Sequence, residues 1–302
     1  KNLFFDLASI TKALVTAPLV CRSLLVQNKL HQETTVESWL GDKSHFFHNN
    51  LRQLSVLDIV NHCAGFPAWH NFWINRLGIT EKLCSQNSLL ETLNQIAQSN
   101  RWFQSKTKCY SDVGYIFLGV CLKLLSGKNL DVLFEDFCQN ELQLKESLLF
   151  FPKQTKNKKN FVSTGFCKIR QRHLHGEVHD ENAAVLGAVA GHAGWFSSGG
   201  GVELYLRKLL GSSFGEKIVD AQKQGDFWPG WQKEPQIDSL QSECVYGHLG
   251  FTGTAFWYLP KKQGYIVFLT NRVISGREPS WIKPLRQEVF CQLSALLGEK
   301  GC

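Results

Sequence analysis

The chain lacks the features that mark several common classes of protein. None of its ten cysteines is spaced as C-x-x-C, which argues against a zinc site and against a thioredoxin-like redox site. No apolar run approaches the roughly 20 residues that a membrane-spanning helix requires. The sequence therefore predicts neither a metal site nor a transmembrane segment.

Methionine is also absent from the 302 residues, although nine tryptophans and 21 phenylalanines are present. A natural chain of this length ordinarily carries several methionines. One interpretation is that they are missing from the printed sequence, in which case some spacings between motifs are one residue short.

The chain has only a small excess of positive charge. The formal net charge is +7, and the basic residues are scattered along the chain. Their densest run, residues 153–159, lies in a polar stretch that predicts a solvated loop. Nucleic acid is therefore not an expected partner. A content of 43% apolar and 20% charged residues is typical of a water-soluble globular protein.

The cysteines mostly lie in apolar helical patterns, as at Cys21, Cys121, Cys138 and Cys291. A free cysteine in such a place behaves as a small hydrophobic residue. This usage favours a reducing cytoplasm, with a bacterial periplasm or cell envelope as the alternative. The oligomeric state is left open.

Hydrophobic periodicity predicts the order of the secondary structure. A helix is expected over residues 10–30 with a kink at Pro18, then a helical region over 51–150, strands at 255–259 and 265–270, and a last helix over 282–297. This order predicts an α/β lobe from residues 1–50 and 185–302, with a mainly helical lobe from residues 51–184 inserted in it. Because so few strands make a thin sheet, we expect further strands to precede the printed sequence.

A serine and a lysine three residues apart give the first chemical signal. Ser9 and Lys12 lie on one face of the first predicted helix. The lysine can lower the cost of ionising the serine, either as a base or as a fixed cation, and the helix N-terminus favours the developing negative charge. The same pattern at 105–108 and 280–283 has charged or loop-like surroundings. From the pattern alone, Ser9 is either a nucleophile or a helix cap.

Five short segments then match one family in order. They are FDLASITK at 5–12, HCAGFP at 62–67, YSDVGY at 110–115, GHAGWFSS at 191–198 and HLG at 248–250. They resemble the nucleophile motif, the HTSGLP loop, the Tyr-x-Asn element, the GGLxST segment and the Lys-Thr-Gly strand (His-x-Gly in several subgroups) of class C β-lactamases and their penicillin-binding and esterase relatives. The resemblance spans nearly the whole chain. It implies an α+β fold of the β-lactamase and transpeptidase type, with an antiparallel sheet flanked by helices and an inserted helical lobe.

The resemblance also implies a serine hydrolase that forms an acyl-enzyme on a small-molecule amide or ester, without metal or organic cofactor. Ser9 would attack the carbonyl, Lys12 and Tyr110 would manage its proton, and the backbone N–H groups of Ser9 and Phe251 would form the oxyanion hole. Tyrosine ionises near pH 10, so Tyr110 needs the neighbouring cation of Lys12 to act as a base. Without the other motifs, Tyr110 would be interpreted as a core aromatic residue at a helix start.

Two substrate-facing positions depart from the family pattern. Asp112 stands where asparagine is commonest; it cannot donate a hydrogen bond unless protonated, and we expect it to pair with Lys12 or with a substrate amine. His248, followed by Gly250 in the same strand, stands where β-lactamases use lysine. Efficient penicillin hydrolysis is therefore less expected than cleavage of another amide or ester.

The histidine carries a further expectation about pH. With an unperturbed pKa of roughly 6.5, His248 should gain charge and bind a carboxylate-bearing β-lactam better as the pH falls towards 6. A lysine at position 248 should then strengthen binding at pH 7. An alternative alignment, slipped by three residues, would place Phe251, Thr252 and Gly253 in the strand motif, but an odd slip turns the side chains to the opposite face.

The polar segment GEVHDEN at 176–182 is rich in groups able to bind a metal or a substrate. It lacks the spacing of a known metal site, and a loop joining the lobes is the simpler interpretation. Together with the GHAG motif it resembles a subgroup associated with cell-wall recycling, which includes serine-type muramoyl-alanine amidases. This points to peptidoglycan fragments as the substrate class.

Two alternatives to that function are kept. One is a carboxylesterase of the same fold with a more apolar pocket, and the other is a non-catalytic muropeptide-binding protein. The intact set of Ser9, Lys12 and Tyr110 argues against the second. Five tryptophans are candidates either for a groove that binds sugar or apolar groups or for the core and lobe interface: Trp69, Trp73, Trp228, Trp231 and Trp257.

Overall fold

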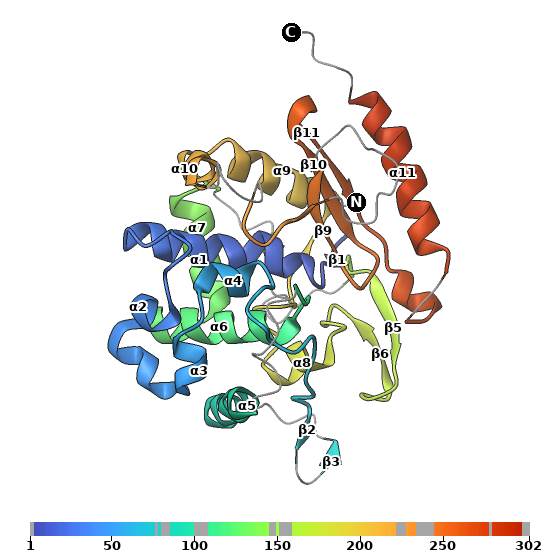
Figure 1. Cartoon of the computed structure of the whole chain (residues 1–302). Helices are drawn as coiled ribbons and strands as arrows, with labels where there is room; N and C mark the ends of the chain where they lie inside the picture. The colour runs from blue at the N-terminus through green and yellow to red at the C-terminus, as the bar shows by residue number, and fades with distance from the viewer. Residues whose placement is uncertain are drawn as a thin grey trace.

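A computed structural model shows the chain as helices packed against small antiparallel sheets (Figure 1). It describes residues 3–75, 78–79, 85–99, 108–144, 149–150, 159–221, 228–233, 245–277 and 280–297. The serine of the 105–108 pattern and most of the basic run at 153–159 lie outside these ranges. In the described part of the chain, no helix has both the length and the apolar character to cross a membrane.

The helices alternate with short strands along the chain. The helical elements are η1 (Lys12–Thr16), α1 (Ala17–Val26), α2 (Val36–Leu40), η2 (Gly41–Phe46), α3 (Asn49–Arg52), α4 (Val56–Val60), α5 (Gln86–Gln98), α6 (Asp112–Ser126), α7 (Leu130–Asn140), α8 (Glu181–Val185), α9 (Gly199–Leu210), α10 (Ser213–Ala221), η4 (Pro260–Lys262), η5 (Arg272–Ser275) and α11 (Ile282–Leu296). The strands are β1 (Phe5–Asp6), β2 (Ile74–Asn75), β3 (Gly78–Ile79), β4 (Leu149–Phe150), β5 (Ser163–Cys167), β6 (Arg172–His175), β7 (Phe196–Ser197), β8 (Gln232–Lys233), β9 (Tyr246–Leu249), β10 (Ala255–Leu259) and β11 (Gly264–Phe268).

The largest sheet has the order β11-β10-β9-β8, and all of its pairs are antiparallel. Its central strand β10 is buried on both faces because helices cover both. Trp257 packs on Phe290 of α11, whereas its neighbour Phe256 points the other way and contacts Trp231 in the main core. Figure 1 shows α9 and α11 on opposite sides of this sheet. The expected antiparallel sheet flanked by helices is confirmed.

The first helix differs from the expected continuous helix over residues 10–30. It begins at Ile10, widens into the π-turn η1, continues as α1 and ends at Val26, so Pro18 lies at the start of α1. Proline has no N–H to bond to the preceding turn. Nearby carbonyls are bonded by side chains instead: Leu14 O accepts from Tyr205 Oη at 2.5 Å and Ala13 O accepts from Trp231 Nε1 at 3.3 Å. The early break in regular winding is therefore stabilised by the core around it.

The predicted division into two lobes stays a prediction. Helices α4 to α7 lie within residues 51–184 as expected, but the same stretch also contains the β5–β6 hairpin. All seven described cysteines are free thiols, and Cys291, expected in an apolar pattern, is exposed because it lies on the outer face of α11.

Two short sheet pairings bring the start of the chain to its middle. Strand β1 pairs with β7, and β7 also pairs with β4. Behind β7, the loop through Gly191 presses against α6, where Gly119 faces it, and Gly191 O accepts a hydrogen bond of 2.6 Å from Thr16 Oγ1. A Cβ added at Gly191 would lie 2.0 Å from Tyr115 O, so only glycine allows this close approach.

We predict that Gly191→Ala lowers the free energy of unfolding by about 2 kcal/mol or more, because backbone must move to relieve the clash. Gly200→Ala is the matched control: it lies in the first turn of α9, where an added Cβ meets nothing within 4 Å. It should leave stability unchanged or raise it slightly through helix propensity. Urea denaturation of both variants checks this, and equal midpoints would contradict the close-packing argument.

Candidate active site

A strained turn presents Ser9 to the solvent-facing side of the structure. Ala8 has φ of +46°, a conformation rare for residues other than glycine, and its N–H donates to Asp6 Oδ1 at 2.9 Å. The helix begins at the next residue after Ser9. Ser9 therefore lies at the N-terminal end of the helix, as predicted.

Lys12 is fully buried directly beneath this serine. Its Nζ lies 2.8 Å from Ser9 Oγ, 2.7 Å from Asp112 Oδ1 and 3.2 Å from His192 O. Burial lowers the pKa of Lys12, but attraction to Asp112 and Tyr110 outweighs burial, so the pKa stands above its ordinary value of 10.5. Lys12 is thus an ammonium ion. Of the two partners expected for Asp112, Lys12 is the one the structure shows.

Tyr110 approaches Ser9 from the loop that leads into α6. Its ring lies 4.9 Å from Lys12 Nζ, and Lys12 and Ser9 both interact with its hydroxyl and lower the pKa against the effect of burial. Although 38% of the residue is exposed, the surroundings of the hydroxyl are enclosed, and burial raises its pKa while Lys12 lowers it. The ring also stacks at 4.5 Å on buried His62. Tyr110 is therefore a cavity residue and not a core aromatic.

His248 reaches the same place from strand β9. Its ring lies 5.8 Å from that of Tyr110, and its Nδ1 lies 2.8 Å from Leu249 O, which assigns the proton of the neutral ring to Nδ1. Burial and the charge of Lys12 lower the pKa of His248 to about 3. The expectation that this histidine gains charge near pH 6 is wrong, because a second cation beside the Lys12 ammonium in a buried site is unfavourable.

The turn after β9 provides the second side of the site. Phe251 and Thr252 lie in this turn and not in a strand, which removes the support for the slipped alignment. Thr252 Oγ1 donates to Asp6 O at 2.6 Å and thereby ties the turn to the strand that precedes Ser9. Within the described ranges, neither the Ser9 N–H nor the Phe251 N–H has a hydrogen-bond partner. Two free donors on neighbouring segments are what an oxyanion hole requires.

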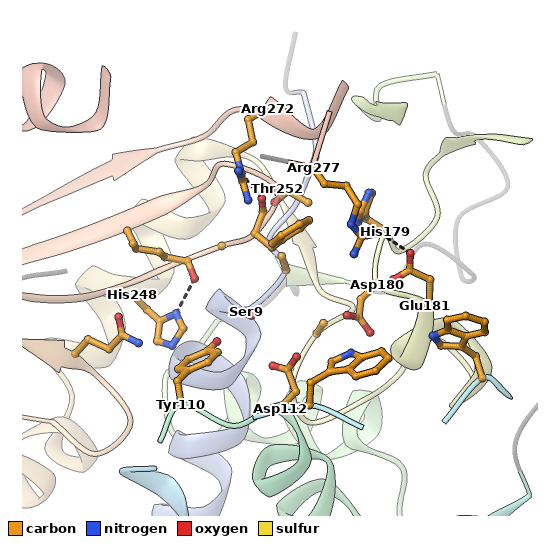
Figure 2. A pocket seen from close by; sticks show the side chains of 18 of the residues that line it. Ser9, Tyr110, Asp112, His179, Asp180, Glu181, His248, Thr252, Arg272 and Arg277 are labelled. Carbon is orange, nitrogen blue, oxygen red and sulfur yellow. Dashed lines mark hydrogen bonds and ion pairs between the residues drawn. The ribbon is translucent and has the colours of Figure 1, made fainter. Parts of the chain in front are cut away.

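These side chains line one cavity of about 610 Å³. Figure 2 shows Ser9 near its centre, between Tyr110 and His248 on one side and Asp180, Glu181 and His179 on the other. Asp112 and Gly250 are also part of its lining. The volume is within the range of sites for small organic ligands. Of the candidate tryptophans, Trp69 and Trp73 line the cavity, whereas Trp228, Trp231 and Trp257 are buried in the core.

The polar segment at 176–182 has structural partners that sequence reasoning did not assign. The N–H of His179 donates to Asp6 Oδ2 at 2.7 Å, and Asp180 Oδ1 lies 2.8 Å from Nε2 of buried His192. Burial opposes ionisation of Asp180, but its pairing with His192 holds its pKa well below the ordinary value. Because His192 O contacts Lys12, the segment braces the loop that helps to hold the lysine. No group of three potential metal ligands occurs among the residues that the structure describes.

A pair of arginines above the oxyanion turn was also missed. The guanidinium carbons of Arg272 and Arg277 lie 4.6 and 5.2 Å from the centre of the Phe251 ring. Arg277 Nη1 forms an ion pair of 2.7 Å with Glu181 Oε1, seen as a dashed line in Figure 2. Their spacing in the sequence matches no motif, so only the fold brings them to the cavity.

Comparison with known proteins agrees with this geometry. The chain is 30% identical to the protein named N-acetylmuramyl-L-alanine amidase of Bacillus subtilis (strain 168), over 89% of this chain and 68% of that protein. It is 28% identical to a putative D-alanyl-D-alanine carboxypeptidase of Escherichia coli (strain K12), over 89% and 69%. Its fold matches a class C β-lactamase from Rhodobacter sphaeroides with a TM-score of 0.68, 15% identity, and coverage of 97% and 86%. The model of the β-lactamase family matches residues 1–287, so the chain belongs to the β-lactamase family.

Proposed function

We propose that this protein is an acyl-enzyme hydrolase in which Ser9 is the nucleophile and the substrate is an amide of a peptidoglycan fragment. The contact of 2.8 Å between Ser9 Oγ and the buried Lys12 ammonium, in a cavity lined by both candidate oxyanion donors, carries this proposal. The names of the amidase from Bacillus subtilis and the carboxypeptidase from Escherichia coli support the substrate class.

The direction of the hydrogen bonds suggests how the serine loses its proton. Charged Lys12 can only donate to Ser9 Oγ, so the serine's own proton is left for the oxygen of Tyr110. Ser9 Oγ then bonds to the substrate carbonyl carbon while its proton passes to the Tyr110 phenolate. The carbonyl oxygen takes up the negative charge, facing the N–H groups of Ser9 and Phe251. Lys12 thus acts as a fixed cation and Tyr110 as the base.

The second half of the reaction follows from the same positions. When the tetrahedral intermediate collapses, the carbon–nitrogen bond breaks, and the leaving amine takes the proton from Tyr110. Water then attacks the carbonyl carbon of the Ser9 ester. Tyr110 accepts a proton from this water and donates it to Ser9 Oγ as the ester bond breaks. Because burial raises the pKa of Tyr110, the phenolate is scarce at neutral pH, and acylation should accelerate as the pH rises.

A carboxylesterase with an apolar pocket is the rival enzyme. The cavity argues for a more polar substrate, since its lining includes Asp180, Glu181, Arg272 and Arg277. Turnover of p-nitrophenyl esters compared with muropeptides separates the two functions. A binding protein without catalysis would bind the muropeptide and leave it intact.

We predict that a fluorophosphonate probe adds once per chain, at Ser9, and that Ser9→Ala abolishes labelling and turnover. Tyr110→Phe should lower kcat for p-nitrophenyl acetate by about 10²- to 10⁴-fold with little change in KM, because it removes the base. Tyr265→Phe is the control, since that hydroxyl bonds Glu203 outside the cavity. Intact-mass and peptide mass spectrometry locate the adduct, and labelling that persists in Ser9→Ala would refute the assignment.

The ion pair of Lys12 with Asp112 predicts the direction in which the pH profile of kcat/KM moves when Asp112 loses its charge. The charge of Asp112 raises the pKa of both Lys12 and Tyr110. Asp112→Asn should therefore lower both values and move both limbs of the pH profile of kcat/KM towards acid. Stability should fall by roughly 3 kcal/mol, as when a buried pair loses one partner.

Profiles of kcat/KM for p-nitrophenyl acetate, corrected for spontaneous hydrolysis and measured from neutral pH to above the ordinary pKa values of tyrosine and lysine, test the Asp112 prediction. Asp42→Asn is the control, because Asp42 is exposed and does not line the cavity. A limb that moves towards alkali in Asp112→Asn would mean that the carboxylate does not act through these two groups.

The buried histidine leads to a different expectation from the one drawn from sequence. With a pKa of about 3, His248 stays neutral between pH 6 and 8, so His248→Asn should leave the pH dependence of β-lactam binding unaltered in that range. His248→Lys should lower the melting temperature and not strengthen binding, because it buries a second amine near Lys12. Titration with a fluorescent penicillin and thermal melts measure both effects. Tighter binding by the lysine variant at pH 7 would restore the original expectation.

A further inference from the structure

The loop motif at 62–67 takes no part in the reaction of Ser9, yet its first residue, His62, has two unfavourable features. Its φ of +62° lies in the left-handed region, which residues other than glycine rarely adopt. The residue is only 6% exposed, and among the described residues nothing forms a hydrogen bond with its Nε2. Backbone strain and an unsatisfied buried group persist where the surrounding structure enforces them, and such residues cluster at functional sites.

The backbone on both sides of Tyr110 is bonded to His62. The N–H of Cys109 donates to His62 O at 3.0 Å, and the N–H of Ser111 donates to His62 Nδ1 at 3.0 Å. The carbonyl and the ring of one residue therefore face the same segment, and the strained φ is the conformation in which they do so. Tyr110 lies between the two bonded residues and is held from both directions along the chain.

The bond to Ser111 requires a neutral imidazole, because a protonated ring has no acceptor nitrogen. Burial, and then the charge of Lys12, lower the pKa of His62 to about 2. The ring is therefore neutral in the range where the protein would work, and acceptance at Nδ1 assigns its proton to Nε2.

The His62 ring also supports the Tyr110 ring from behind. It packs between Tyr110 and Tyr115, with ring centres 4.5 and 5.1 Å away. Tyr115 is fully buried, and its hydroxyl donates to Val60 O at 2.8 Å, so the back of the stack is fixed. Lys12 Nζ lies 4.9 Å from the centre of the Tyr110 ring. The stack thus sets the place of Tyr110 relative to the lysine.

We propose that His62 is a positioning residue for Tyr110. Its bonds to Cys109 and Ser111, together with its ring, hold the Tyr110 hydroxyl where Ser9 and Lys12 interact with it. His62 is not part of the cavity lining, so it acts through the tyrosine and not on the substrate. The proposal rests on the proposed function of Ser9 and adds the residue that fixes its base.

Two substitutions that both accept a positive φ separate the hydrogen bond from backbone strain. His62→Gly removes the acceptor and the ring, and should lower kcat for p-nitrophenyl acetate by about 10- to 100-fold with KM within about twofold, because a displaced base slows only the chemical step. In His62→Asn, Oδ1 takes the position of Nδ1, so kcat should stay within about fivefold of wild type.

A double-mutant cycle with Tyr110→Phe tests whether the effect passes through the tyrosine. Once the phenol is gone, His62→Gly should slow the protein by less than about twofold more, because groups that act as a unit are not additive. The rate constant for fluorophosphonate labelling of Ser9, followed by intact-mass spectrometry, is measured in all four proteins. Labelling is stoichiometric, so slow variants still give a rate.

The matched control is His48→Gly. His48 Nδ1 accepts from the N–H of Asn50 at 3.2 Å at the start of α3, and the residue lies outside the described cavity lining. The variant loses the same kind of bond, so its melting temperature should fall while kcat and the labelling rate stay unchanged. Thermal melts confirm that each variant is folded at the assay temperature.

The possible outcomes distinguish the two proposals. Absence of Ser9 labelling in the wild-type protein would overturn the proposed function itself. If wild type is labelled and folded His62→Gly reacts at the same rate, the positioning role is wrong and the hydrolase proposal stands. A full additional loss in the Tyr110→Phe background would show that His62 does not act through Tyr110. A loss above about tenfold in folded His62→Asn would also overturn the role, and this result decides alone if the glycine variant does not fold.

Discussion

The burial of one ammonium group is the constraint on which the rest of the site depends. A buried charge without partners is too costly to persist, so Lys12 must be surrounded by acceptors from whichever segments can reach it. It obtains them from Ser9 in its own helix, from Asp112 at the start of α6 and from the backbone of His192. Those three partners lie far apart in the sequence, and satisfying one charge therefore fixes the relative positions of three segments. The same charge also keeps nearby histidines neutral: burial and Lys12 lower the pKa of His62 to about 2 and that of His248 to about 3.

A second buried charge, Asp6, connects the outer parts of the site. Its carboxylate accepts from the N–H groups of Ala8 and His179, and its own carbonyl accepts from Thr252. Burial raises the pKa of Asp6 from 3.8 to about 6 despite these bonds. A carboxyl group whose pKa is higher in the folded state costs stability once it ionises. Ionisation of Asp6 therefore lowers the free energy of unfolding as the pH rises from about 4 to 6. The loss at pH 7 is on the order of 3 kcal/mol. In return, Asp6 positions three parts of the site. It bonds to the strained turn at Ala8, to the segment at 176–182 and to the turn that carries Phe251.

The sequence predicted the parts of this protein that depend on local pattern. The helix start at Ser9, the strand at 255–259 and the pairing of Ser9 with Lys12 follow from spacing and periodicity, and the structure has all three. Properties set by the environment could not be predicted. The sequence predicts an ordinary pKa for His248, because nothing in HLG indicates that the ring is buried beside a cation. The ion pair of Glu181 with Arg277 joins residues 96 positions apart in the sequence. The hydrogen bond from Phe72 N to the Asn182 side chain joins residues 110 positions apart. Such contacts depend on the whole fold.

The chemistry and the specificity of the cavity are consequently set by different residues. The candidate reacting groups are those with matching motifs, whereas Arg272 and Arg277 of the lining come from a segment with no motif of its own. A neutral His248, whose Nδ1 is bonded to Leu249 O and whose Nε2 is buried from solvent, offers no positive charge to a substrate carboxylate. With no cation at position 248, positive charge in the cavity lining comes from Arg272, Arg277 and Arg286, and Arg277 is already paired with Glu181. A ligand carboxylate that approached Arg277 would compete with Glu181 for its guanidinium. The charge that a ligand meets in this cavity is therefore set by arginines that only the fold brings there, and not by the residue at the position where β-lactamases carry lysine.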